Sequence, residues 1–333
     1  MMTGLFASVP IIIGLAIVGD LDVTTGTVIA GAAPLIYATI GETITEKAGV
    51  VNLSLDGSLL LSAMAGFGIA FLSGSVILGF LAAAAVSALV ALIIAYAGIE
   101  LRLNQIAVGF VLFLLCTRLS ALLGAPFVRE PGPAVPKLEI PLLADIPFLG
   151  KALFQHNLSI YGSFVVVLVA YWFFYRTRPG LELQAVGERP ESAFARGVSV
   201  RRVRYFYTIL GGALVGIGGA AFSLDQKFGW SEGHVRNFGW IALAIVIFGG
   251  WHPFRVALGC YLFGALQVVA LKLQPVFPGL SQVLPILPFP TMILTLVVIN
   301  RPGFRALGDR FGSLRKFLAS EPPAALGTNF EQQ

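Results

Sequence analysis

The sequence predicts an all-α fold, a polytopic membrane bundle of about eight to ten transmembrane helices with both termini in the cytoplasm. Hydrophobic residues make up 57% of the chain and charged residues only 12%, whereas a soluble domain carries about 25% charged residues. Apolar segments recur along the whole length, and many approach the roughly 20 residues that cross a hydrocarbon core as a helix. Residues 76–96 are apolar on both faces, which excludes the alternating pattern of a membrane β-barrel.

Ten apolar segments are the candidate membrane helices, and the count falls to eight or nine if the weakest of them do not span. Segment 239–250 is short and ends in Gly-Gly-Trp-His-Pro, which favours a broken or re-entrant helix. Gly212 and Gly216 have the spacing of small residues at close helix contacts, so they predict tight packing. The ten segments are 5–19, 26–41, 55–73, 76–97, 105–124, 158–176, 208–224, 239–250, 254–273 and 284–300.

The orientation of the bundle follows from its basic residues, because short loops rich in Lys and Arg stay in the cytoplasm. With the N-terminus inside, fifteen basic residues fall in cytoplasmic segments and six in external loops. We expect a transmembrane domain at residues 1–310, with an external loop at 125–157 and a cytoplasmic loop at 176–204, and a flexible cytoplasmic tail at 311–333. This topology accounts for the net charge of +5, so no nucleic-acid partner is needed.

The cytoplasmic loop 176–204 contains the stretch ERPESA at residues 188–193. Proline and acidic residues near the positive end of a helix dipole are typical of a helix start. A short helix in such a loop is a natural docking surface for a partner. A solvated loop whose charges only fix the topology explains the same residues equally well.

Motifs of catalysis are absent from the sequence. No G-x-x-x-x-G-K-[ST] phosphate loop, G-x-S-x-G elbow or H-E-x-x-H pair occurs, which disfavours a membrane enzyme. Any energy from ATP must therefore come from another subunit. A carrier driven by an ion gradient would normally place a carboxylate at mid-membrane, and none of the ten segments has one in its central part.

The polar stretch GETITEKAGVVNLSLDG, residues 41–57, lies between two apolar segments. The predicted topology places it at the cytoplasmic ends of the helices, where charges are solvated. Asn52 and Asp56 then lie at the start of segment 55–73, near the positive end of its dipole. No metal site is expected there, and Asp56 either contacts a moving gate or only caps the helix.

This polar stretch resembles the signature of permease subunits of ATP-binding-cassette (ABC) importers in the ribose, nucleoside and branched-chain amino acid branch. The resemblance is strongest to nucleoside-type permeases that work with basic-membrane-lipoprotein binding proteins. Residues 103–115, 140–154, 185–206 and 239–254 are similar to further motifs of that family, in the same order. Asp56 stands where Glu is usual. The matching signature positions are Gly41, Glu42, Glu46, Gly49, Asn52, Asp56 and Gly57.

The resemblance implies a permease that forms the path of a nucleoside or related small polar solute, with a simple sugar or another heterocycle as the alternative. Its partners would be an ABC ATPase, a second and related permease, and a substrate-binding lipoprotein or periplasmic protein, all at the bacterial plasma membrane. The ATPase would use ATP and Mg²⁺, while this chain would bind no cofactor and hold no catalytic residue. The residues expected to couple it to the ATPase are Gly187, Glu188, Pro190, Ala193 and Gly197.

A nucleoside site needs aromatic stacking and a few amide or hydroxyl partners. Trp240 is a candidate for the stacking, and Asn104, Gln105 and Gln267 are candidates for the amides. Tryptophan also concentrates at membrane interfaces for reasons unrelated to substrate, which is the competing explanation for Trp240.

Overall fold

The computed structural model describes residues 21–299, apart from 142, 143, 145, 147–149, 234 and 281, together with residues 322–328 and 330. Within this part, seven helices are long and apolar enough to cross a membrane, which confirms the helical membrane bundle. The expected segment 5–19 lies outside the described residues. The seven helices are α2 (Leu21–Lys47), α3 (Leu55–Ser73), α4 (Val76–Ile99), α5 (Gln105–Gly124), α6 (Leu158–Arg176), α9 (Val200–Ala221) and α11 (Pro253–Leu273).

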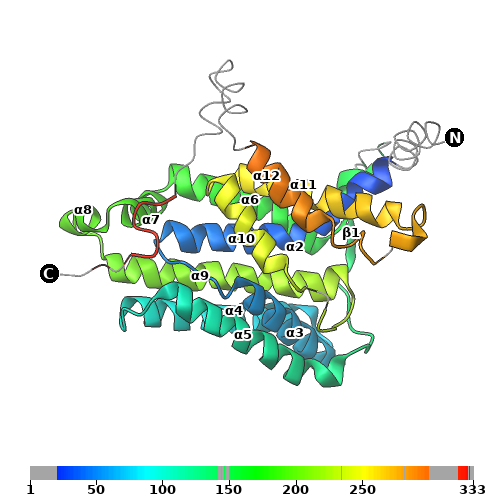
Figure 1. Ribbon diagram of the computed structural model, residues 1–333, viewed down its shortest axis with the longest axis horizontal. Helices are drawn as coiled ribbons and strands as arrows, with labels where there is room; N and C mark the ends of the chain where they lie inside the picture. Colours follow the sequence, from blue (N-terminus) through cyan, green and yellow to red (C-terminus); the bar gives the residue numbers. More distant parts are fainter. Residues whose placement is uncertain are drawn as a thin grey trace, which may run out of the picture.

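The long helices lie side by side, with the short helices α7 and α8 at one end of the bundle and strand β1 toward the other (Figure 1). We call these the α8 end and the β1 end. Strands β1 (Lys137–Glu139) and β2 (Gln155–Asn157) pair antiparallel within the predicted loop 125–157. The remaining elements are α7 (Arg178–Glu188), α8 (Pro190–Ala195), α10 (Phe238–Gly249), α12 (Pro288–Ile299), the 3-10 turns η1 (Ala125–Phe127) and η4 (Pro278–Leu280), and the π-helical turns η2 (Gly150–Phe154) and η3 (Phe222–Gln226).

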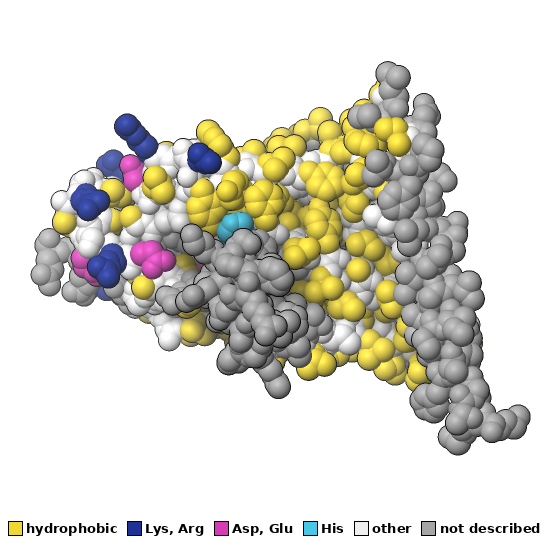
Figure 2. All heavy atoms as spheres, turned by 90° about the horizontal axis from the view of Figure 1, so that it is seen from above, with side chains coloured by type: hydrophobic (Ala, Val, Ile, Leu, Met, Phe, Trp, Pro, Cys, Tyr) yellow, Lys and Arg dark blue, Asp and Glu magenta, His cyan; other side chains and the backbone are white. Residues whose placement is uncertain are grey.

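Side chains divide the surface into a hydrophobic belt and a charged end. Figure 2 shows the visible basic and acidic side chains gathered at the α8 end, beyond a broad hydrophobic surface. Helices α4, α5 and α6 all carry exposed leucines or valines. In the most apolar stretch of each helix, 72% of α2 and 78% of α3 is buried, against 22% of α5. Helices α2 and α3 therefore lie at the centre of the bundle, and α5 lies at its periphery.

Small residues let α9 approach its neighbours. A side chain at Gly211 would collide with the backbone of Gly41 on α2, and one at Gly216 would collide with the backbone of Ala83 on α4. Gly212 likewise packs against Ala91 of α4. These contacts confirm the tight packing that the glycine spacing predicts.

Helix α2 is longer than predicted, because residues 42–47 continue it instead of forming a solvated loop. Glu42 and Glu46 are buried, so the expectation that the charges of the polar stretch are solvated is wrong. The chain reverses at Gly49, whose φ of +85° is a conformation that favours glycine. It then runs back into the bundle rather than along its surface.

The re-entering chain follows α5 inward. The backbone N–H of Val51 donates to Oε1 of Gln105 at the start of α5 (2.9 Å), Leu53 packs on Gly109, and Gly57 packs on Phe113. Since a helix rises about 1.5 Å per residue, Phe113 lies about 12 Å along the axis of α5 from its first residue, Gln105. Helix α3 therefore starts inside the bundle, which corrects the prediction that Asn52 and Asp56 lie at the membrane surface.

Candidate functional site

Two helix starts meet inside the bundle. The carboxylate of Asp56, at the start of α3, accepts a hydrogen bond from the backbone N–H of Gly239 in the first turn of α10 (2.8 Å). Asp56 is buried, and the contact leaves no room for a side chain at position 239. A carboxylate at this place satisfies a free N–H group and the positive end of the helix dipole. Asp56 therefore caps α10, not the helix that contains it.

Helix α10 is too short to cross a membrane alone. Its twelve residues give a length of about 18 Å, against a hydrocarbon core of about 30 Å. It begins beside Asp56 and ends at the α8 end, where the indole Nε1–H of Trp251 donates to Glu46 of α2 (2.5 Å). The prediction that segment 239–250 forms a broken or re-entrant helix agrees with this geometry in that the segment does not span, although α10 itself is continuous.

A pocket opens on the β1 side of this junction. It has a volume of about 370 Å³ and lies among α2, η3 and helices α10 to α12, within the size range of small-molecule sites. Phe222, Phe238 and Phe289 line it, with ring centroids 4.7 Å apart for the first pair and 6.1 Å for Phe238 and Phe289. The polar residues that line it are Gln226, Lys227, Arg236, Asn237 and Gln267.

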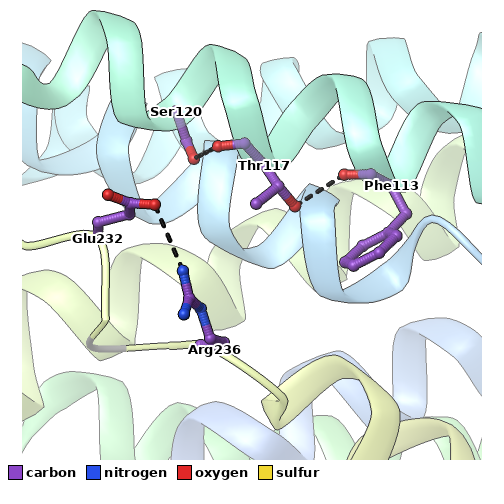
Figure 3. A network of polar contacts seen from close by, with 5 residues as sticks. All are labelled: Phe113, Thr117, Ser120, Glu232 and Arg236. Carbon is purple, nitrogen blue, oxygen red and sulfur yellow. Dashed lines mark hydrogen bonds and ion pairs between the residues drawn. The ribbon is translucent and has the colours of Figure 1, made fainter.

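The segment that enters α10 carries an ion pair. Glu232 accepts from Nη2 of Arg236 at 3.3 Å (Figure 3). Figure 3 also shows that Thr117 and Ser120 of α5 turn back onto carbonyl groups of their own helix, each at 2.8 Å. Those two hydroxyls are therefore paired within α5 and are not directed into the pocket.

The four predicted substrate residues are not brought together. Gln267 lines the pocket, whereas Trp240 stacks edge-on against Phe113 of α5 with ring centroids 5.4 Å apart. Asn104 caps α5 by accepting from the N–H of Ala107 (3.1 Å). Gln105 holds the re-entering chain, as described above. The sequence analysis missed Gln226, Lys227 and Asn237, whose signal is the polar run between segments 208–224 and 239–250.

The signature residues at the end of α2 join it to the turn between α10 and α11. Besides the bond from Trp251 to Glu46, His252 of this turn lies near Lys47 and Arg255. Burial, aided by these two cations, lowers the pKa of His252 from 6.5 to about 4. The imidazole is therefore neutral at pH 7. Asn52 shapes the chain after α2, because its Oδ1 accepts from the N–H and the hydroxyl of Ser54.

The five predicted coupling residues lie in and around α7 and α8. Gly187 packs against the carbonyl of Lys47 so closely that a side chain would collide. Pro190 opens α8, and both it and Ala193 are buried. Gly197 follows α8 with a φ of +86°. Glu188 is exposed at the end of α7.

The described part of the tail, residues 322–328 and 330, packs against this region. The N–H of Ala325 donates to the carbonyl of Gly187 (2.8 Å), and the N–H of Gly327 donates to that of Gly49 (3.0 Å). Arg204 of α9 donates to the carbonyl of Thr328 (2.9 Å). A side chain at Gly49 would press on Arg204 and on the carbonyl of Ala325, so the glycine leaves room for these contacts.

Apolar spanning helices, a helix start inside the bundle and a pocket beside it define a polytopic membrane transport protein. The chain belongs to the family of branched-chain amino acid transport system permease components, whose family model matches residues 24–296.

Three relatives of the chain are permeases named for ABC transporters. It is 37% identical to TsgC13 of Haloferax volcanii, a permease assigned to a glucose ABC transporter, over 74% of this chain and 76% of the relative. It is 31% identical to the nucleoside ABC transporter permease NupC of Lactococcus lactis, over 80% and 87% of the two chains. It is also 31% identical to the guanosine ABC transporter permease NupQ of Bacillus subtilis, over 80% and 88%. No solved structure matches the chain.

Proposed function

We propose that this chain is the membrane-spanning permease subunit of an ABC importer that takes up a nucleoside or a related small polar solute. The observation that carries the substrate class is the pocket beside the α10 start, which combines three phenylalanine rings with the amides of Gln226, Asn237 and Gln267. Aromatic faces suit a purine or pyrimidine base, and amides suit its edge and the ribose hydroxyls. The nucleoside permeases NupC and NupQ support this choice.

A simple sugar is the second candidate, and the likeness to TsgC13 favours it. Sugars also bind through amides and stack on aromatic rings, so the same pocket serves either ligand. A nucleoside needs both an aromatic slot and a polar rim, whereas a monosaccharide gains less from the slot. Removing one phenylalanine ring from the pocket should therefore reduce the uptake of a nucleoside more than the uptake of a monosaccharide.

The importer would include partners that this chain does not supply. We propose an ABC ATPase that uses ATP and Mg²⁺, a second permease of the same family, and a substrate-binding lipoprotein or periplasmic protein. The basic α8 end then faces the cytoplasm of a bacterial cell, in line with the positive-inside rule. The binding protein delivers substrate at the β1 end, where the pocket lies.

The contacts of the α8 end suggest how ATPase movement reaches the pocket. The ATPase docks on the exposed faces of α7 and α8, and Gly187 transmits the movement to the end of α2 at Lys47. The bond between Trp251 and Glu46 passes it to α10. The start of α10 borders the pocket through Phe238, so a shift of this short helix changes the pocket directly.

Uptake of labelled nucleoside into proteoliposomes tests the function. The complex of both permeases, ATPase and binding protein should accumulate nucleoside only with ATP, and excess glucose should not compete. Gln267→Leu should reduce uptake, while Gln274→Leu, at the residue that follows α11 and outside the pocket, should not. Uptake that needs an ion gradient and no ATP would instead identify a secondary carrier.

The proposed coupling between the ATPase and this chain can be tested separately. Replacing Glu188 and Pro190 should reduce substrate-stimulated ATP hydrolysis or co-purification of the ATPase, because the two residues lie at the junction of α7 and α8. Unchanged coupling in these variants would rule out α7 and α8 as the docking element.

A further inference from the structure

Asp225 is a buried acidic residue that the proposed transport path does not use. It is 4% exposed and lies in the π-helical turn η3, which follows α9. Its two carboxyl oxygens accept hydrogen bonds from two other buried side chains, one from the amide Nδ2 of Asn157 and one from the hydroxyl of Ser159. Since each oxygen has its own donor, the direction of the carboxyl group is fixed.

The two donors tie η3 to the loop between α5 and α6. Asn157 ends strand β2, and Ser159 lies in the first turn of α6. This stretch is anchored on α2 as well, because the hydroxyl of Tyr37 donates to the carbonyl of Ser159 (2.6 Å). A second point of the loop reaches η3 where the N–H of Val135 donates to the carbonyl of Leu224 (3.2 Å). Two separate points of the loop therefore hold η3.

The same turn forms a wall of the pocket beside the α10 start. Phe222 and Gln226, the first and last residues of η3, line this pocket, and so does Lys227, which follows the turn. The amide of Gln226 is fixed by its own bond to the carbonyl of Ala30 on α2 (2.6 Å). Turns of this π-helical kind are rare and are frequently found at functional sites. The bonds of Asp225 therefore act on the turn that presents a ring and an amide to the pocket.

A carboxyl group is a costly way to join two buried segments. Well-packed apolar side chains would join them without the free energy of removing a polar group from water. Hydrogen bonds add a defined distance and angle, which apolar packing does not impose. The contact between Asp225 and its two donors therefore fixes the orientation of η3, and not only its proximity to β2.

We propose that Asp225 is a positioning residue for the substrate pocket, which holds Phe222 and Gln226 in place through its bonds to Asn157 and Ser159. The loop between α5 and α6 then sets the affinity of the pocket for its substrate, although none of the described residues of that loop lines the pocket. The proposal rests on the proposed function in treating this pocket as the substrate site.

The first test is equilibrium binding to the purified complex of permeases and ATPase, without the binding protein, whose own site would mask the pocket. The probes are labelled adenosine and labelled glucose, one for each candidate substrate class. Asp225→Ala should raise the Kd of the probe that binds about three- to tenfold and leave the number of sites per complex unchanged. A residue that served stability alone would lower the number of sites and leave the Kd of the remaining ones unchanged.

Two further variants keep the test independent of whether Asp225→Ala folds. Asn157→Ala removes one donor at a position whose side chain makes no cap bond to α6, and it should raise the Kd in the same direction. Asp225→Asn keeps one acceptor oxygen, and Asn157 can turn its amide to pair with the new one. This variant should therefore restore most of the affinity that Asp225→Ala loses.

Gln155→Ala is the matched control. Gln155 lies in the same strand as Asn157, but its amide donates to the carbonyl of Ala144 within the loop (3.1 Å). This variant removes a hydrogen bond of the loop and leaves the bonds to Asp225 in place, so the Kd should stay at the value of the unmodified chain.

Hydrogen–deuterium exchange tests the link to η3 without any substrate. The amides of residues 222–227 should exchange faster in Asn157→Ala than in the unmodified chain, and Gln155→Ala should have no such effect. If neither probe bound the unmodified complex, the proposed substrate classes would be wrong, and the exchange rates alone would still decide whether Asp225 holds this turn.

Three results would overturn the proposal. Unchanged exchange in Asn157→Ala would show that β2 does not hold η3. Faster exchange with an unchanged Kd would show that the position of η3 does not matter to the pocket. Equal increases of the Kd in Asn157→Ala and Gln155→Ala would show a general effect of loosening the loop.

Discussion

Asp56 and Gly239 lie 183 positions apart in the sequence and meet inside the bundle, where the carboxylate of Asp56 accepts the backbone N–H of Gly239 at 2.8 Å. The contact fixes the start of the short helix α10 against the start of α3. In this arrangement the cap of one helix is supplied by another, so the two helices cannot separate without leaving a buried N–H group and a buried carboxylate unpaired.

Replacing Asp56 should therefore affect folding before transport. Asp56→Ala removes the acceptor and should destabilise the protein by about 1–3 kcal/mol. Asp56→Asn keeps an acceptor oxygen and loses only the charge at the helix dipole, which costs about 0.3–1 kcal/mol. Thermal unfolding and the level of folded protein in membranes measure the effect. Normal stability with transport lost would show that Asp56 acts in a gate instead.

Gly239 should tolerate no side chain. Gly239→Ala places a Cβ against the backbone of Asp56, and such overpacking costs about 1–3 kcal/mol or more. Gly233→Ala is the matched control, because nothing lies within 4 Å of a Cβ at that position. A clear loss of folded protein is expected for the first variant and not for the second. Similar behaviour of the two would contradict the close contact.

The bond between Trp251 and Glu46 should link the end of α2 to α10. Trp251→Phe leaves a buried carboxylate without its donor, which costs about 1–3 kcal/mol. Transport per ATP hydrolysed should fall as well, since the bond lies on the proposed route to the pocket. Trp240→Phe serves as the comparison, because it removes another indole, one on α10 that stacks on Phe113 of α5, and leaves the bond from Trp251 to Glu46 intact.

A double-mutant cycle isolates this pair. Glu46→Leu and Trp251→Phe together should cost less than the sum of the single changes, because each variant removes the same bond. Additive losses in unfolding free energy would show that the two side chains do not interact.

The apolar helices could be predicted from the sequence, but the contacts that form the site could not. Segments 55–73, 105–124 and 158–176 match their helices, because each is an apolar run bounded by polar or turn residues. The end of α2 was mispredicted because two glutamates, Glu42 and Glu46, normally indicate a segment that is exposed to solvent. Their burial depends on residues such as Trp251, more than 200 positions away. No local sequence pattern predicts a contact between residues so far apart in the chain.

The pocket was only partly predictable for the same reason. Gln267 was singled out because an amide in an apolar segment is unusual. Phe238 and Phe289 looked like ordinary core residues, since aromatic side chains in membrane helices are common. Both rings line the pocket together with Gln267 because α10 starts inside the bundle, and that start could not be read from the local sequence.

His252 should contribute a pH dependence to stability. Its pKa is lowered to about 4 in the folded protein, against 6.5 when it is free. Well above pH 6.5 the imidazole of His252 is neutral in both the folded and the unfolded protein. Between pH 6.5 and about 4 the unfolded chain binds a proton that the folded chain does not, so stability falls as the pH decreases. His252→Asn should reduce this decline in thermal unfolding measurements. An unchanged decline would place the titrating group elsewhere.

Removing the docked tail should weaken the α8 end. Truncation after residue 321 deletes the bonds from Ala325 to Gly187 and from Gly327 to Gly49, and the acceptor that Thr328 offers to Arg204. Each bond contributes about 1 kcal/mol, so a lower unfolding temperature is expected. Since these bonds hold α7 against the turn after α2, substrate-stimulated ATP hydrolysis should fall as well. Truncation after residue 330 keeps all three bonds and should behave like the full chain. If the shorter chain retained full stability and coupling, the tail would have no role in positioning α7.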